Sequence, residues 1–228
     1  MSNSCNYVVA TTKSWNIENF NQRWAQNPQW HLITEPNELT TELIGELKPK
    51  YIFFPHWSWI VSEEITRQYE CVCFHMTDLP YGRGGSPLQN LIVNGHAETK
   101  LSVLRMTEEL DAGPIYFQLP LALDGKAEEI FRRCSALSFD AIATMVETNP
   151  IPQPQVGKPT FFKRRRPAQS ELKQVDSVTQ FFDHVRMLDA EGYPKAFICH
   201  NGLRLEFSEA ELSEGVVTAN VKVFKTDE

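Results

Sequence analysis

Short apolar runs alternate with amphipathic stretches over the first two thirds of the chain. The apolar runs predict buried strands, and the stretches with apolar residues three or four positions apart predict helices. Strands that alternate with helices favour a parallel sheet built from crossover units. Asn37 is the expected N-cap of the helix that follows the second strand. The predicted strands of this part are residues 6–10, 30–34, 51–54, 70–75, 100–106 and 114–121.

The composition changes after residue 148. Four prolines occur in residues 149–159, which is typical of a semi-rigid linker. Beyond the linker, Asn201-Gly202 is a strong hairpin turn between two short strands. The predicted fold class is therefore α/β, with a Rossmann-like, mostly parallel open sheet flanked by helices and a small C-terminal α+β appendage. The predicted domains are residues 1–148, a linker at 149–159, and residues 160–228.

Charge and cysteine usage narrow the classes of function. The net charge of -7 argues against nucleic acid and anionic membranes as partners. No stretch approaches the length of a membrane span, and the N-terminus lacks the pattern of a secretory signal. Five dispersed cysteines fit buried thiols in a reducing cytoplasm better than disulfides. Cys71 and Cys73, without a second pair nearby, are weak evidence for a metal, so no metal site is expected.

A histidine and an aspartate frame a glycine-rich loop in the middle of the chain. His75 ends a predicted strand, the loop covers residues 79–87, and Asp111 lies in a Leu-Asp-Ala-Gly-Pro turn. Reactive groups of open α/β sheets gather at the carboxyl ends of strands, and a histidine near a carboxylate suits proton transfer. Each residue also has an ordinary interpretation, as a structural histidine and as a turn-capping aspartate.

The turn after the first strand is a weaker candidate. It lacks a Gly-x-Gly-x-x-Gly fingerprint, so a dinucleotide site is not predicted there. Lys13 and Ser14 could hold an anion at the start of the following helix, and an ordinary helix start with a solvated lysine explains them equally well.

The motifs around His75 resemble those of a known family. The chain reads His75-x-Thr-x-Leu-Pro-x-x-Arg-Gly-x-x-Pro-Leu-Gln, then Asn-Gly-x-x-Glu-Thr, then Leu-Asp-x-Gly-Pro-Ile. This order is similar to that of the folate-dependent, methionyl-tRNA formyltransferase-like enzymes, and the specific match covers about residues 50–120. Residues 186–197 and 204–207 resemble the tail of sugar-nucleotide N-formyltransferases of the pseudaminic-acid type.

The resemblance implies roles for individual residues. His75 and Asp111 fall on two of the three catalytic positions of the family, whereas Cys73 stands where the family has asparagine. Asn94-Gly-His96 imitates the family's Asn-x-His motif but lies in a turn. His56 is a candidate to compensate for the missing amide. Residues implied to bind the co-substrate lie in two segments: Trp57, Trp59, Ile60, Met106, Glu109 and Leu110. Residues proposed for the substrate side are Arg83, Gly84, Lys13 and Ser14.

The implied reaction is transfer of a formyl group from N10-formyltetrahydrofolate to the amine of a nucleotide-linked amino sugar. The alternatives are formylation of another small amine such as an amino acid, and a folate-binding pseudoenzyme, because one catalytic position is changed. Lys163–Arg166 could suggest nucleic acid, but four cations in an acidic chain more often form a solvated surface. The resemblance also makes the C-terminal appendage a candidate for homodimer formation.

Overall fold

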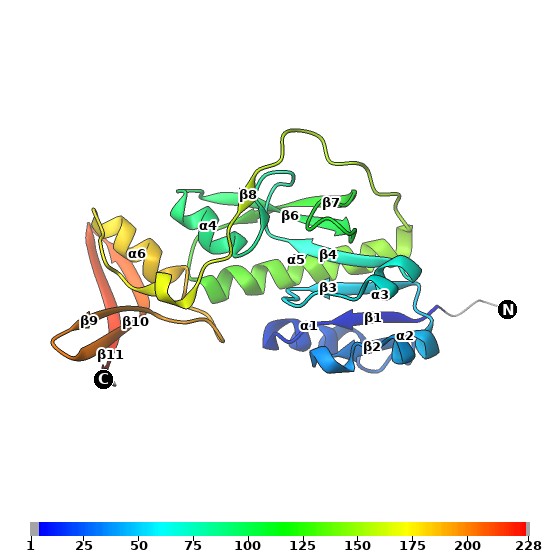
Figure 1. Cartoon of the computed structure of the whole chain (residues 1–228), viewed down its shortest axis with the longest axis horizontal. Coiled ribbons are helices and arrows are strands. Elements are labelled where there is room, and N and C mark those ends of the chain that lie inside the picture. Colours follow the sequence, from blue (N-terminus) through cyan, green and yellow to red (C-terminus); the bar gives the residue numbers. More distant parts are fainter. Residues whose placement is uncertain (1–4, 227–228) are drawn as a thin grey trace. The chain divides into compact units, whose positions relative to one another are not determined.

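The computed structural model describes residues 5–226 and divides them into two compact units (Figure 1). Unit 1 contains residues 5–84, 100–121 and 132–161, and unit 2 contains residues 85–99, 122–131 and 162–226. Both units therefore draw on separate stretches of the chain. The domain boundaries at residues 148 and 160 stay a prediction.

Unit 1 is built on a sheet with the strand order β2-β1-β3-β4-β6-β7. The first four strands in this order are parallel, and β6 runs antiparallel to β4. This arrangement confirms the predicted class of a mostly parallel α/β sheet. The strands are β1 (Tyr7–Ala10), β2 (Trp30–Ile33), β3 (Tyr51–Pro55), β4 (Cys71–His75), β6 (Glu98–Arg105) and β7 (Ile115–Ala122).

Helices cover both faces of this sheet because its buried strands carry apolar residues on both sides. Val8 and Phe54 share one face with Ile44 of α2 (Thr41–Leu47) and Ile65 of α3 (Glu63–Gln68). On the other face, α1 (Ser14–Trp24) and α5 (Ala127–Thr148) are joined by Asn19, whose amide donates to the Ser135 hydroxyl at 2.9 Å. Among residues 5–226, no helix is long and apolar enough to cross a membrane.

The expected cap at Asn37 is wrong. Pro36–Glu38 forms a short 3-10 helix, and Glu38 is the residue that reaches back to the backbone at Glu35, so Asn37 lies inside this turn. The α-helix starts later. Thr40 is its N-cap, with the hydroxyl accepting from the Leu43 N–H at 3.2 Å.

Unit 2 combines helices with an antiparallel sheet of order β11-β10-β9. Asn201 and Gly202 have φ values of 47° and 72°, which suits a tight turn and confirms the predicted hairpin between β9 and β10. Its elements are α4 (Pro87–Val93), α6 (Val178–Arg186), β9 (Ala196–His200), β10 (Leu203–Ser213) and β11 (Val216–Lys225). A further strand pair, β5 (Arg83–Gly84) with β8 (Phe161–Phe162), has no counterpart in the sequence prediction.

Candidate active site

The structure brings His75 and Asp111 together. His75 ends β4, and its Nδ1 lies 3.6 Å from Oδ2 of Asp111, with both side chains at least nine-tenths buried. The other ring nitrogen, Nε2, lies 2.9 Å from the Gly82 carbonyl oxygen. A carbonyl only accepts hydrogen bonds, so Nε2 carries a proton. An ion pair with Asp111 therefore forms when Nδ1 is protonated as well.

The turn that holds Asp111 is locally constrained. Asp111 adopts a φ of 54°, a left-handed conformation that aspartate tolerates better than most residues. A side chain at Gly113 would place its Cβ 1.8 Å from the Arg105 carbonyl oxygen, so only glycine fits there. The Gly84 N–H donates to Oδ2 of Asp111 at 2.9 Å. The glycine-rich loop thus fixes the carboxylate as well as the histidine.

Arg83 is anchored inside the protein. Its Nε and Nη2 donate to Oε1 of Gln155 at 3.2 and 2.8 Å, and its Nη1 donates to Oε1 of Glu109 at 3.1 Å. Its side chain is only 11% exposed. Glu109, predicted to line the co-substrate site, is here the partner of this arginine. A direct contact of Arg83 with a substrate stays a prediction.

Gln155 was missed by the sequence analysis, although its amide also donates to the carbonyl oxygens of Asp111 and Gly113 at 2.8 and 2.9 Å. A lone glutamine among prolines carries no pattern from which these contacts can be predicted.

Cys73 lies on β4 opposite Phe54 of β3, two residues before His75. Burial raises the pKa of the Cys73 thiol, and the charge of Asp111 raises it further. The residue that replaces the family asparagine is consequently a neutral thiol, which is a weak donor and no anionic nucleophile.

His56 and Lys13 both contact Trp15. The rings of Trp15 and His56 are 5.5 Å apart, and Nζ of Lys13 lies 5.7 Å from the centre of the Trp15 ring. Burial lowers the pKa of His56 to about 3, and Lys13 contributes in the same direction. His56 is therefore neutral at physiological pH. Ser14 begins α1 without acting as its cap, because Lys13 occupies that position.

An aromatic pair follows β3. The rings of Trp57 and Trp59 are 5.1 Å apart, and Trp57 and Met106 pack against the same apolar cluster of the sheet. The Trp57 Nε1 atom is buried and has no hydrogen-bond partner among the described residues. Three neighbouring candidates expose apolar surface instead: Trp59 (47%), Ile60 (100%) and Leu110 (69%).

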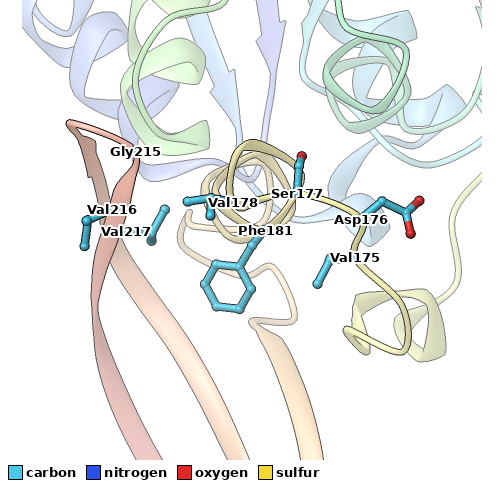
Figure 2. A pocket seen from close by; sticks show the side chains of 8 residues that line it. All are labelled: Val175, Asp176, Ser177, Val178, Phe181, Gly215, Val216 and Val217. Atoms are coloured by element: carbon cyan, nitrogen blue, oxygen red, sulfur yellow. The ribbon is translucent and has the colours of Figure 1, made fainter.

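A hollow of about 520 Å³ lies in unit 2 (Figure 2). Its walls come from α6 and from the turn between β10 and β11, including Val178, Phe181 and Val216. Ser177 in its wall accepts from the Gln180 N–H as the cap of α6. These lining residues include no histidine, so the pocket does not repeat the histidine–carboxylate pair of His75 and Asp111. Within residues 5–226, no three His, Cys, Asp or Glu side chains cluster as metal ligands would.

Comparisons with known proteins place most of the chain in one family. A family model described as "Formyl transferase" matches residues 11–139, and one described as "Methionyl-tRNA formyltransferase, C-terminal domain" matches residues 167–224. A methionyl-tRNA formyltransferase of Rickettsia typhi is 26% identical over 194 residues, which are 82% of this chain. The chain spans 63% of the length of that relative.

Solved structures extend the comparison. A methionyl-tRNA formyltransferase from Clostridium thermocellum superimposes with a TM-score of 0.93 at 46% identity, over 97% of this chain and 99% of that chain. A sugar N-formyltransferase from Shewanella sp. gives a TM-score of 0.65 at 15% identity, over 95% and 96% of the two chains. The second likeness is one of fold alone.

Proposed function

The chain belongs to the formyl transferase family, and from that premise we propose that it moves a formyl group from N10-formyltetrahydrofolate to the amine of a nucleotide-linked amino sugar. Members of the family are enzymes that transfer formyl groups from this co-substrate. The observation that carries the proposal for this chain is the buried pair of His75 and Asp111 at the end of β4.

The proposed roles follow from the geometry of that pair. The co-substrate supplies an activated formyl group, whose carbon forms a bond to the amine nitrogen while its bond to N10 breaks. His75, protonated at Nδ1, offers a donor to the oxygen that gains negative charge. Asp111 accepts the proton that the amine loses, directly or through water, and the N10 leaving group takes up a proton in turn. The carboxylate also favours the orientation of the ring in which Nδ1 points toward it.

The residues after β3 suit a flat, polar co-substrate. The buried N–H of Trp57 has no partner among the described residues, although buried donors are nearly always satisfied. A pteridine ring carries oxygen and nitrogen acceptors of the kind that this N–H lacks, and the neighbouring Trp59 exposes apolar surface. Trp57 and Trp59 are therefore the residues that we assign to the folate.

The choice of amine rests on charge. A net charge of -7 disfavours a polyanionic substrate such as tRNA, because RNA-binding surfaces need a basic footprint. In the Lys163–Arg166 cluster, Arg165 is half-buried and donates to the Gln169 carbonyl, so part of this charge serves the fold. We extend the proposal to amino sugars of the pseudaminic-acid type on the tail motif of residues 186–197.

Methionyl-tRNA is the second candidate. It is favoured by the 46% identity with the Clostridium thermocellum protein, which extends over nearly all of both chains. In addition, the tail residues behind the pseudaminic-acid resemblance have structural uses, since Arg186 donates to the carbonyl oxygens of Leu123 and Gly125 at 2.6 and 2.9 Å.

A panel of candidate amines distinguishes these proposed substrates. Purified protein and N10-formyltetrahydrofolate are mixed with UDP-linked 4-amino sugars, with free amino acids, or with methionyl-tRNA, and both released tetrahydrofolate and the formylated product are measured. We expect turnover with an amino-sugar nucleotide. Turnover confined to methionyl-tRNA or to an amino acid would reassign the amine, and folate binding without turnover on any amine would make the chain a pseudoenzyme.

Variants of the catalytic pair test the mechanism. We expect His75→Asn and Asp111→Asn each to lower kcat by about 100- to 10,000-fold, the usual contribution of a positioned acid or base. The matched control is His96→Asn, because His96 belongs to the Asn94-Gly-His96 sequence that imitates the family motif but lies after α4. The kcat of this control should stay within about two-fold of wild type. Activity of either catalytic variant near that of the control would refute the assignment.

A further inference from the structure

The proline-rich segment between α5 and β8 does more than connect two parts of the chain. In Figure 1 it leaves the end of α5 and returns to β8. Its backbone is held along the way, because Gln153 and Ile115 exchange hydrogen bonds of 2.8 and 2.7 Å and the Thr160 N–H donates to the Pro80 carbonyl at 3.1 Å. All of these residues belong to unit 1, which also contains the catalytic pair.

Gln155 holds the aspartate side of the site. Its amide nitrogen donates to the carbonyl oxygens of Asp111 and Gly113, and its oxygen accepts two hydrogen bonds from Arg83. Both hydrogens of the amide and both lone pairs of its oxygen are thereby used. The turn that carries Asp111 is thus fastened to a side chain 44 residues further along the chain.

Thr160 holds the histidine side. Its hydroxyl accepts from the Gly82 N–H at 2.7 Å, and its carbonyl accepts from the Arg83 N–H at 2.9 Å. The carbonyl of the same Gly82 faces Nε2 of His75 at 2.9 Å. Thr160 therefore holds the peptide group between Gly82 and Arg83 in place. The carbonyl oxygen of this group is the acceptor that requires a proton on Nε2 of His75.

We infer that Gln155 and Thr160 are positioning residues, through which the segment clamps Asp111 and His75 into their reacting arrangement. The inference rests on the proposed function, because it assigns these contacts a purpose in formyl transfer. Neither side chain needs to touch a substrate. Their removal should displace the reacting groups.

Kinetics provide the first test. We expect Gln155→Met, which keeps the length of the side chain but has no amide, to lower kcat by about 10- to 100-fold, because misplacing a reacting group by about 1 Å costs that much. The KM values for N10-formyltetrahydrofolate and for the amine should change by a smaller factor than kcat, although Arg83 also loses its contact with Gln155. The matched control is Gln153→Met, since the exposed Gln153 side chain donates only to the nearby Ile151 carbonyl.

Thr160 allows a rescue experiment. Thr160→Val keeps the shape of the side chain but removes the acceptor for the Gly82 N–H, and we expect kcat to fall at least five-fold. Thr160→Ser restores the hydroxyl and should return kcat to within about two-fold of wild type. A purely structural role for the methyl group of Thr160 predicts the reverse order of these two variants.

An NMR measurement tests the clamp independently of turnover. The Gly84 amide, which donates to the Asp111 carboxylate, should exchange with solvent faster in Gln155→Met than in wild type or in Gln153→Met. If the wild-type protein formylates no amine, the proposed function fails. The exchange rate of the Gly84 amide would still decide whether Gln155 fixes the Asp111 carboxylate.

Three outcomes would overturn the inference. They are unchanged Gly84 exchange in Gln155→Met, equal kcat for Gln155→Met and Gln153→Met, and a rise in KM at constant kcat, which would place Gln155 in a binding surface.

Discussion

At the scale of single residues, Cys73 poses the main question of the site. The resemblance implies an asparagine there, whose amide would donate to the developing oxyanion. Burial and the nearby Asp111 keep the Cys73 thiol protonated by raising its pKa, so its S–H is a much weaker donor. The Gly84 N–H, the nearest backbone donor to Asp111, is already engaged by that carboxylate. Under the proposed mechanism, we therefore expect most of the oxyanion stabilisation to come from Nδ1 of His75.

His56 offers a measurable pH signature. Burial lowers its pKa to about 3 from an ordinary 6.5, so the folded protein does not bind a proton there when the unfolded chain does. The free energy of unfolding should consequently decrease as the pH falls from about 6.5 toward 3, by up to about 1.4 kcal/mol per pH unit from this residue. Urea unfolding of wild type and His56→Gln at pH 7 and pH 4.5 measures the effect.

The variant should lose less stability than wild type over that interval, because glutamine does not titrate. Exposed His200 is the control, and His200→Gln should follow the wild-type curve. Parallel curves for wild type and His56→Gln would show that His56 is not buried in its neutral form.

At the scale of elements, the sequence identified strands and helices where the pattern of apolar residues was regular. It placed the third and fourth strands of the sheet within one residue of β3 and β4. It failed where backbone and side-chain contacts between distant residues decide the structure. The β5–β8 pair has two residues per strand, which is too short for any period to be visible.

The residues of the candidate site also fall into two groups, those that a local motif predicts and those that only long-range contacts bring to the site. His75 and Asp111 were found because each lies in a recognisable local motif. Gln155 and Thr160 reach the site only through the path of the proline-rich segment, which the sequence predicted as a linker. Their contacts join residues 44 and 78 positions apart, and nothing local to either residue signals such partners.

A buried carboxylate stabilises an irregular strand in unit 2. Asp189 is 3% exposed, accepts from Nζ of Lys195 at 2.6 Å, and accepts from the Glu209 N–H at 2.6 Å. Glu209 lies at the bulge of β10 and has a φ of 50°. Lys195→Met would remove the lysine that pairs with Asp189, while Lys126, whose pKa the charge of Asp189 helps to raise, stays nearby. We expect the free energy of unfolding to fall by about 2 kcal/mol, less than for a fully buried pair because Lys195 is partly exposed.

Urea titration of purified variants measures this loss. Lys173→Met is the matched control, because the Lys173–Glu171 pair leaves the lysine side chain 75% exposed, and its removal should cost under about 1 kcal/mol. Equal losses for the two variants would mean that the Glu209 N–H and Lys126 stabilise the charge of Asp189 without Lys195.

At the scale of the whole molecule, the outer edge of unit 2 bears on assembly. β11 is an edge strand of its sheet, and among the described residues no strand pairs with its outer side. Val221 and Val223, which face the same side of the sheet, are 45% and 58% exposed. Proteins usually protect long edge strands with charges or prolines, and β11 carries Lys222 and Lys225. The apolar surface that Val221 and Val223 expose beside these lysines is where we expect a second copy to pack.

We therefore expect the wild-type protein to form a homodimer through β11, as the sequence resemblance suggested for the appendage. Val223→Lys adds a charge to the apolar surface of Val221 and Val223 without disturbing the core and should yield monomers, which light scattering coupled to size-exclusion chromatography can measure. Val93→Lys is the control, because Val93 is 55% exposed at the end of α4, outside the sheet of β9–β11. A wild-type monomer, or a dimer that survives Val223→Lys with unchanged affinity, would place the contact elsewhere. Since the charge is added in unit 2 and the catalytic pair lies in unit 1, kcat of the monomeric variant would then reveal whether pairing matters for turnover.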